Sequence, residues 1–253
     1  MDDSFCIAAA QTCSIAGDLE HNVQRHCAQV SLAAEQGVQL LLFPELSLSG
    51  YEPEQVAKCT TGAQDPRLAP LHSLAQRHDM TLVLGAPLDS GTDRPHIGAL
   101  VLFPDGSHSH YHKHHLHTGE ERWSTAGQAD SALVRVAGRN AALAICADIT
   151  HPEHALAAAR NGADLYLAGV LLSKQGYAAD MAHLQRYSAE HGYAVLLSNH
   201  GAPSGGYDAA GRSAFWAPGG QLLAATDGPG EHLLVVRQRH GEWTASSFAV
   251  ASY

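Results

Sequence analysis

The chain has 253 residues, of which 45% are hydrophobic and 16% charged, a balance typical of a folded globular protein. Its formal net charge is −10, and no basic stretch interleaves with aromatic residues, so we expect neither nucleic acid nor an anionic membrane surface as a partner. The N-terminus is acidic, unlike a secretory signal, and apolar runs such as Leu165–Leu172 are too short to cross a bilayer. These features predict a cytoplasmic protein.

Segments typical of strands and of helices alternate along the chain, which indicates an α/β fold with sheets inside and helices outside. Expected strands cover residues 5–11, 38–43, 81–86, 98–103, 141–146, 165–170, 193–198, 213–216 and 232–237. Expected helices cover residues 19–36, 66–78, 152–161 and 179–191. Asp18 is placed to cap the first helix, and Gly37 and Gly162 follow the ends of the first and third. No linker divides the chain, so we expect a single domain over residues 1–253.

The five cysteines are odd in number and contain no Cys-x-x-Cys pair, which predicts reduced thiols and no disulfide framework. They are Cys6, Cys13, Cys27, Cys59 and Cys146. Four of the five are expected to fill space as small buried residues. The remaining question is whether one of them reacts.

Three ionisable residues follow or end expected strands, where α/β folds gather their reactive groups. Glu45 comes directly after an apolar strand, and Lys113 lies on the segment returning from a turn at residues 104–106. Cys146 ends a strand before a sharp turn and a helix, an elbow that points a side chain and backbone N–H groups into one cleft. Each residue taken alone also has an interpretation without a catalytic role. Glu45 could belong to an exposed turn, Lys113 could lie on an exposed strand face, and Cys146 could be a buried structural thiol.

Together, the blocks around these residues resemble the motifs of the nitrilase, or carbon–nitrogen hydrolase, superfamily. Residues 43–46 (Phe-Pro-Glu-Leu), 111–116 (Tyr-His-Lys-His-His-Leu) and 145–148 (Ile-Cys-Ala-Asp) resemble its glutamate, lysine and cysteine motifs, in the right order. The resemblance covers nearly the whole chain. It implies a four-layer α-β-β-α sandwich of the nitrilase type and an enzyme that needs no metal or organic cofactor.

The resemblance also implies roles for individual residues. Cys146 would be the nucleophile, and Glu45 the general base that takes its proton. Lys113 and the backbone N–H of Ala147 would stabilise the tetrahedral intermediate. A second glutamate follows the lysine in the family; Glu120 is favoured by spacing, with the adjacent Glu121 as the alternative.

Expected substrate-binding residues are Tyr51, after the glutamate motif, and Val170 and Leu171, past the strand that follows the cysteine helix. A Val at that position would narrow the pocket and favour a short, slender acyl group. Ala147 and Leu156 stand where the family more often has a tyrosine and an arginine, which leaves the substrate class open.

Histidine is unusually common, with 18 residues, and six of them crowd one segment. These are His108, His110, His112, His114, His115 and His117. Alternation along a strand would place the first four on one face, which suits Zn²⁺, Ni²⁺ or Cu²⁺. Lys113 within the segment would repel a cation, however, and we favour a solvated strand face without a metal.

The sequence therefore predicts a hydrolase that cleaves the C–N bond of a small linear amide through a cysteine thioester. The substrate could be an ω-amide, an aliphatic amide or an N-carbamoyl amine. The alternatives are an acyltransferase of the same family and a histidine-rich metal-binding or scaffold protein on a hydrolase fold. We also expect a homodimer or larger assembly, with the apolar C-terminal segment, residues 243–253, reaching a partner subunit.

Overall fold

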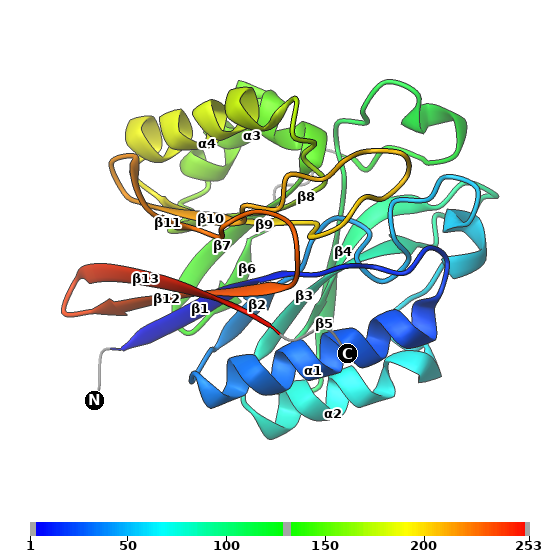
Figure 1. Ribbon diagram of the computed structural model, residues 1–253, viewed down its shortest axis with the longest axis horizontal. Helices are drawn as coiled ribbons and strands as arrows, with labels where there is room; N and C mark the ends of the chain where they lie inside the picture. Colours follow the sequence, from blue (N-terminus) through cyan, green and yellow to red (C-terminus); the bar gives the residue numbers. More distant parts are fainter. Residues whose placement is uncertain (1–3, 129–132, 251–253) are drawn as a thin grey trace.

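A computed structural model describes residues 4–128 and 133–250 of the chain. Two β-sheets pack face to face, with a pair of helices covering the outer face of each sheet (Figure 1). The architecture is the four-layer α-β-β-α sandwich that the sequence predicted.

The larger sheet has seven strands and the smaller has six. In spatial order, the larger sheet contains β13 (Glu242–Ala249), β12 (His232–Arg239), β1 (Phe5–Gln11), β2 (Leu40–Leu42), β3 (Thr81–Leu88), β4 (His96–Leu102) and β5 (His108–His112). The smaller contains β11 (Gln221–Ala225), β10 (Ala214–Ala217), β9 (Ala194–Asn199), β8 (Leu165–Val170), β7 (Arg139–Ile145) and β6 (Val134–Val136). Each has a parallel centre, β1-β2-β3 and β7-β8-β9, flanked by antiparallel strands.

The longer helices cover the sheets, and short 3₁₀ turns lie in the connections. The helices are α1 (Leu19–Glu35), α2 (Ala69–Arg77), α3 (Pro152–Arg160) and α4 (Tyr177–His191). The 3₁₀ turns are η1 (Val56–Cys59), η2 (Pro66–Leu68), η3 (Glu120–Arg122) and η4 (Cys146–Thr150). Asp18 caps α1 as expected, since its Oδ1 accepts a hydrogen bond of 3.1 Å from the backbone N–H of His21.

Three apolar layers hold the sandwich together. The central layer fills the space between the sheets with side chains such as Ile7, Leu143 and Phe215. The two outer layers join the seven-stranded sheet to α1 and α2 and the six-stranded sheet to α3 and α4. Both faces of the parallel strands are therefore buried, which explains why they form continuous apolar runs in the sequence.

The sheet edges account for most of what the sequence did not predict. Strands β6, β11 and β13 were not expected; β6 has only three residues, and alternate residues of β13 are exposed. Trp243 of β13 packs against Phe5 and Phe215 of its own chain. Residues 251–253 of the predicted C-terminal segment lie outside the described residues.

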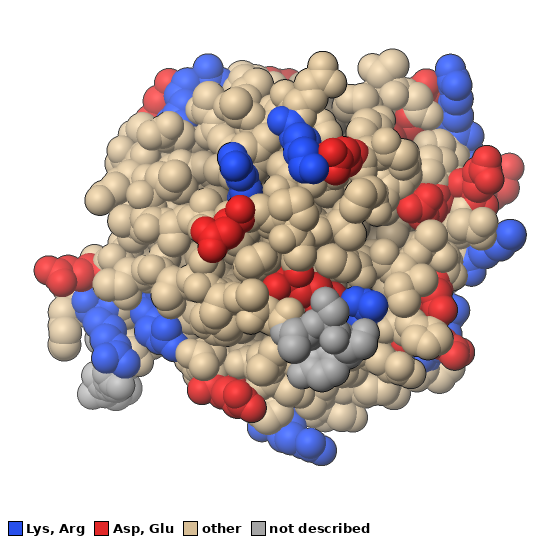
Figure 2. All heavy atoms as spheres, viewed as in Figure 1, with Lys and Arg blue, Asp and Glu red and all other residues tan. Residues whose placement is uncertain are grey.

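Charged side chains are dispersed over the surface. On the face shown in Figure 2, Lys and Arg side chains stand singly or beside acidic ones. Among the described residues, no helix combines the length and hydropathy needed to span a membrane.

Candidate active site

Glu45 lies on a tight loop that is clamped between the two sheets. The loop follows β2, and Leu46 next to Glu45 has a positive φ of 49°. An added Cβ on Gly85 of β3 would lie 1.9 Å from the carbonyl oxygen of Pro44, and one on Gly169 of β8 would lie 2.8 Å from that of Phe43. Only glycine admits such a close approach of backbone, so both sheets fix the position of Glu45.

Cys146 occupies the elbow that the sequence predicted. It follows β7 directly, begins η4 and has a positive φ of 43°, an uncommon conformation for a residue other than glycine. Its side chain is partly exposed, and Sγ lies 3.7 Å from the carbonyl oxygen of Leu171. Since β7 and β8 are parallel neighbours, their carboxyl ends place Cys146 and Leu171 at the same edge of the sheet.

Lys113 is fully buried and bonded to two carboxylates at once. Its backbone N–H continues the pairing at the end of β5 by donating to the carbonyl of Ile97 at 2.8 Å. Nζ lies 2.6 Å from Oε1 of Glu45 and 2.8 Å from Oε1 of Glu120. A buried ammonium needs such partners, because removing it from water without them is costly.

Glu120, not Glu121, lies at this centre. Its Oε1 also accepts a hydrogen bond of 2.7 Å from the Tyr51 hydroxyl, and its Oε2 accepts one of 2.7 Å from the backbone N–H of His117. Glu121 is exposed and accepts a bond from the backbone of Gly119. The geometry thus separates the two glutamates that the sequence left open.

The charges at the centre shift one another's pKa values. Burial raises the pKa of Glu45 to about 7; Lys113 opposes this rise, and Glu120 adds to it. Burial alone would lower the pKa of Lys113. Three neighbouring groups raise it by more than burial lowers it: Glu45, Cys146 and Glu120. Lys113 therefore remains an ammonium. Burial and then Glu45 raise the pKa of Cys146 well above its ordinary value, although Lys113 acts in the opposite direction. The resting sulfur is therefore a thiol that needs a base.

A cavity of about 230 Å³ opens above these residues. It is lined by Glu45, Tyr51, His117, Glu120, Cys146, Ala147, Thr150, Leu171, Leu172, Ser173, Gly176, Asp180 and Tyr207. The expected oxyanion residue, Ala147, and the expected binding residues Tyr51 and Leu171 are thus in its wall. One oxygen of Glu45, Oε2, is buried there without a hydrogen-bond partner among the described residues.

Val170 does not line this cavity, contrary to expectation. Its side chain packs in the apolar layer between the six-stranded sheet and its helices, whereas Leu171 belongs to the layer between the sheets. The difference follows from strand geometry, since successive side chains point to opposite faces. The argument that a valine narrows the pocket therefore has no support in the structure.

Asp148 ties the lysine segment to the cysteine elbow. Its carboxylate accepts hydrogen bonds from the Tyr111 hydroxyl at 2.7 Å, the backbone N–H of His115 at 2.9 Å and that of Ile145 at 3.0 Å. Burial acts to raise the pKa of Asp148, but these bonds and nearby histidines outweigh it and hold the pKa at about 2. Asp148 thus fixes the segments that carry Lys113 and Cys146 relative to each other through these hydrogen bonds.

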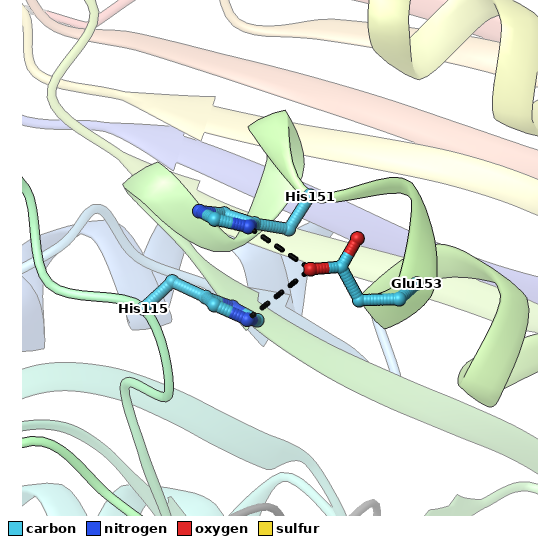
Figure 3. Close-up of side chains that lie close together, drawn as sticks. All are labelled: His115, His151 and Glu153. Carbon is cyan, nitrogen blue, oxygen red and sulfur yellow. Dashed lines mark hydrogen bonds and ion pairs between the residues drawn. The ribbon is translucent and has the colours of Figure 1, made fainter.

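Among the described residues, one group brings metal-ligand atoms close together, and it lies beside Asp148. Figure 3 shows His115, His151 and Glu153, whose ligand atoms all lie within 4.8 Å of one another. The two imidazole rings stack at 3.7 Å with planes 10° apart. Nitrogen lone pairs lie in the ring plane, so nearly parallel, stacked rings do not direct them at one ion. The group is arranged for hydrogen bonding to Glu153, at 3.1 Å from His151, and not for shared coordination.

The histidine row of β5 is only partly as predicted. His110 and His112 stack on one face of the sheet with His96 of β4. His114 lines a cavity together with His96, His110 and His112, and it also lies near Tyr111 and His154, where it lines a second cavity of about 280 Å³.

Residues 6–245 match the carbon–nitrogen hydrolase family. This chain belongs to that family. It is a carbon–nitrogen hydrolase, as the three motifs predicted. An (R)-stereoselective amidase of Pseudomonas sp. is 28% identical over 211 residues, which cover 82% of this chain and 75% of the relative. The chloroplastic omega-amidase of Arabidopsis thaliana is 26% identical over 231 residues, or 85% and 62% of the two chains.

Solved structures of an amidase from Nesterenkonia sp. AN1 share the fold and part of the sequence. One variant in complex with butyramide has a TM-score of 0.85 and 29% identity, covering 94% of this chain and 92% of that one. Another carries the acetamide moiety of fluoroacetamide on its active-site cysteine, with a TM-score of 0.85 and 30% identity over 93% and 90% of the chains.

Several cavity residues had no signal in the sequence. His117, Tyr207 and Ser173 come from loops, and Asp180 comes from the first turn of α4. Asn199, at the end of β9, holds the segment after β8 through bonds of 2.8 and 3.1 Å to the backbone of Leu172. Loop positions of this kind depend on long-range packing, which a local pattern does not encode.

Proposed function

We propose that this carbon–nitrogen hydrolase is an amidase, converting a small linear amide to a carboxylic acid and ammonia or an amine through a thioester on Cys146. The observation that carries the proposal is that a thiol and two carboxylates line a single cavity, and that both carboxylates bond to one buried ammonium, that of Lys113. Relatives and structural neighbours named as amidases support it.

In the first step, Glu45 removes the thiol proton while Cys146 Sγ attacks the carbonyl carbon of the amide. The raised pKa of Glu45, about 7, matches a group that must accept and then return a proton near neutral pH. The C–S bond forms as the carbonyl π electrons move to oxygen. That oxyanion is stabilised by the Lys113 ammonium and the backbone N–H of Ala147, and each such donor contributes about 3 kcal/mol in acyl transfer.

In the second step, the C–N bond breaks and the leaving nitrogen takes the proton held by Glu45. A thioester remains on Cys146. Glu45, again a carboxylate, removes a proton from water as the water oxygen attacks the thioester carbon. Collapse of this second intermediate breaks the C–S bond, and the sulfur regains the proton from Glu45. The acid leaves, and the centre returns to its starting charge.

Glu120 acts as a positioning residue for Lys113 in this scheme. It bonds to Nζ together with Glu45 and is itself fixed by Tyr51 and the backbone of His117. A cation held between two carboxylates cannot swing away when the substrate enters. The small cavity favours a short acyl chain, in keeping with the butyramide and acetamide groups in the neighbours.

Three further features belong to the proposal. We propose that the whole chain forms one hydrolase domain, and that it works in the reducing environment of the cytoplasm, which suits its five unpaired cysteines. We propose a homodimer or larger assembly, supported by the edge strand β13 with its exposed Phe248. Light scattering of the purified protein tests the assembly, and a monomer mass would contradict it.

The activity is tested by measuring ammonia release from butyramide, an N-carbamoyl amine and butyronitrile. Wild type should release ammonia from butyramide, and Cys146→Ala should not. Cys27→Ala, which removes a partly exposed thiol on α1, is the matched control and should keep full activity. Equal release by wild type and Cys146→Ala would refute the proposed nucleophile.

A further inference from the structure

Carboxylates dominate the charged groups around the cavity. Its described lining includes Glu45, Glu120 and Asp180 but neither Lys nor Arg. The one ammonium at its base, Lys113, is shared between the first two of these carboxylates. With one cation against two buried carboxylates, Asp180 is an additional acidic group that no Lys or Arg in the described wall neutralises.

Asp180 is placed to meet a substrate. It lies in the first turn of α4, is half-buried, and forms no hydrogen bond or ion pair through its side chain with another described residue. Its Oδ2 lies next to Gly176, 3.3 Å from where a Cβ on that residue would be. Gly176 also lines the cavity, so a larger side chain there would cover the carboxylate.

Two histidines face Asp180 and partly offset the rise that burial causes in the pKa of its carboxyl. Burial raises its pKa, while His183 and His117 lower it. Its position near the N-terminus of α4 also stabilises the anion. Lys174, in the loop before α4, pairs instead with Asp208 at 2.9 Å, and Arg212 lies over the ring of Tyr177. Both of these cations line a different cavity.

We propose that Asp180 selects amides whose chain ends in a positively charged group, and that the cavity disfavours amides ending in a carboxylate. The proposal rests on the proposed amidase function and names its substrate class. An ammonium remote from the scissile bond would pair with the free carboxylate of Asp180. A terminal carboxylate would meet a like charge in a wall without a cation, which costs affinity.

This selection is expected to act mainly on KM. Asp180 does not contact Cys146, Glu45 or Lys113 through any hydrogen bond, so it has no part in the chemical step. A partly exposed ion pair is screened by solvent, and a preference of about fivefold in kcat/KM is therefore expected. The preference should shrink at high salt, because screening weakens exposed charge pairs.

Three amides of equal chain length test the proposal: pentanamide, its analogue with a terminal amino group, and the monoamide of glutaric acid. In wild type, the amino analogue should exceed pentanamide by about fivefold in kcat/KM, and the glutaric monoamide should fall below it. Asp180→Asn should remove most of both differences, so that the three amides approach one another in kcat/KM. Glu190→Gln makes the same charge change on an exposed part of α4 and should preserve the preference.

Equal kcat/KM for the three amides in wild type, or an unchanged preference in Asp180→Asn, would overturn the inference while leaving the amidase proposal intact. Calorimetric binding of the same three amides to Cys146→Ala gives a second measurement that needs no turnover. A binding order that favours the amino analogue there, lost in Cys146→Ala/Asp180→Asn, supports the inference even if hydrolysis fails. Failure of hydrolysis by wild type would instead count against the proposed function.

Discussion

Replacing Glu45 by Gln should abolish activity and yet make the protein more stable at neutral pH. The raised pKa of Glu45 means that the folded protein holds this proton more tightly than the unfolded chain does. The unfolded carboxyl releases its proton near pH 4.5, and the folded one near 7. The stability that Glu45 contributes is therefore fully present below about pH 4.5, falls as the pH rises, and is lost above about 7.

The size of this effect follows from the same two values. A difference of one unit in pKa corresponds to about 1.4 kcal/mol. The rise in the pKa of Glu45 from 4.5 to about 7 therefore lowers the free energy of unfolding of wild type by about 3 kcal/mol above neutral pH. Gln carries no charge, keeps an oxygen that can accept from Lys113, and leaves Glu120 as the counter-ion. The variant should lose this pH dependence.

Urea denaturation of wild type and Glu45→Gln, followed by circular dichroism between pH 5 and 8, measures the difference directly. Buried histidines such as His26 and His200, whose burial lowers their pKa values to about 3 and about 4, act with the opposite sign. They are present in both proteins and cancel in the difference. Stability of the variant relative to wild type should rise by about 2–3 kcal/mol over this range. Parallel pH profiles, or retained amide hydrolysis, would refute the reasoning.

Two other substitutions test the supports of the site. Tyr51→Phe removes a hydroxyl that is bonded to the buried carboxylate of Glu120. We expect the free energy of unfolding, measured by urea denaturation, to fall by about 2 kcal/mol, and kcat to fall about tenfold. Unchanged values would contradict the role given to Glu120. Gly85→Ala places a methyl group 1.9 Å from the Pro44 carbonyl and should displace the Glu45 loop, so that activity and thermal stability both collapse. Gly62→Ala, with open space around it, is the control and should behave as wild type.

The central residues of the site could be predicted from the sequence because each of them comes shortly after the end of a strand. Glu45 comes after β2 and Cys146 after β7, and both positions could be inferred from an apolar run that stops. Lys113 follows the polar strand β5, and it was inferred from the turn before that strand and from the resemblance of residues 111–116 to the lysine motif. What the runs did not show is that two sheets meet there, with glycine backbones clamping the Glu45 loop between them. That contact joins residues far apart in the chain.

The placement of Val170 shows where pattern alone fails. All residues of β8 are buried, because helices cover one face and the second sheet the other. A strand buried on both sides has no polar alternation, so the sequence cannot tell which face a given side chain takes. Val170 and Leu171 were both expected to line the pocket, and of the two only Leu171 is in the cavity wall.

The edge strands of the sheets and the residues at the mouth of the cavity also could not be predicted from the sequence. Short or half-exposed strands such as β6 and β13 carry a weak apolar signal. Asp180 and Tyr207 reach the cavity only because α4 and the loop after β9 pack over the end of β8. Substrate preference is determined by such residues, which explains why the family and the chemistry could be predicted but the substrate class could not.

The central claim is that catalysis passes through an acyl group on Cys146, and mass spectrometry of the acid-quenched enzyme during butyramide turnover tests it most directly. The account predicts an added butyryl group on the peptide that contains Cys146, present in wild type and absent from Cys146→Ala. Turnover of butyramide with that peptide unmodified at every time point, or a butyryl group on another residue, would contradict the account.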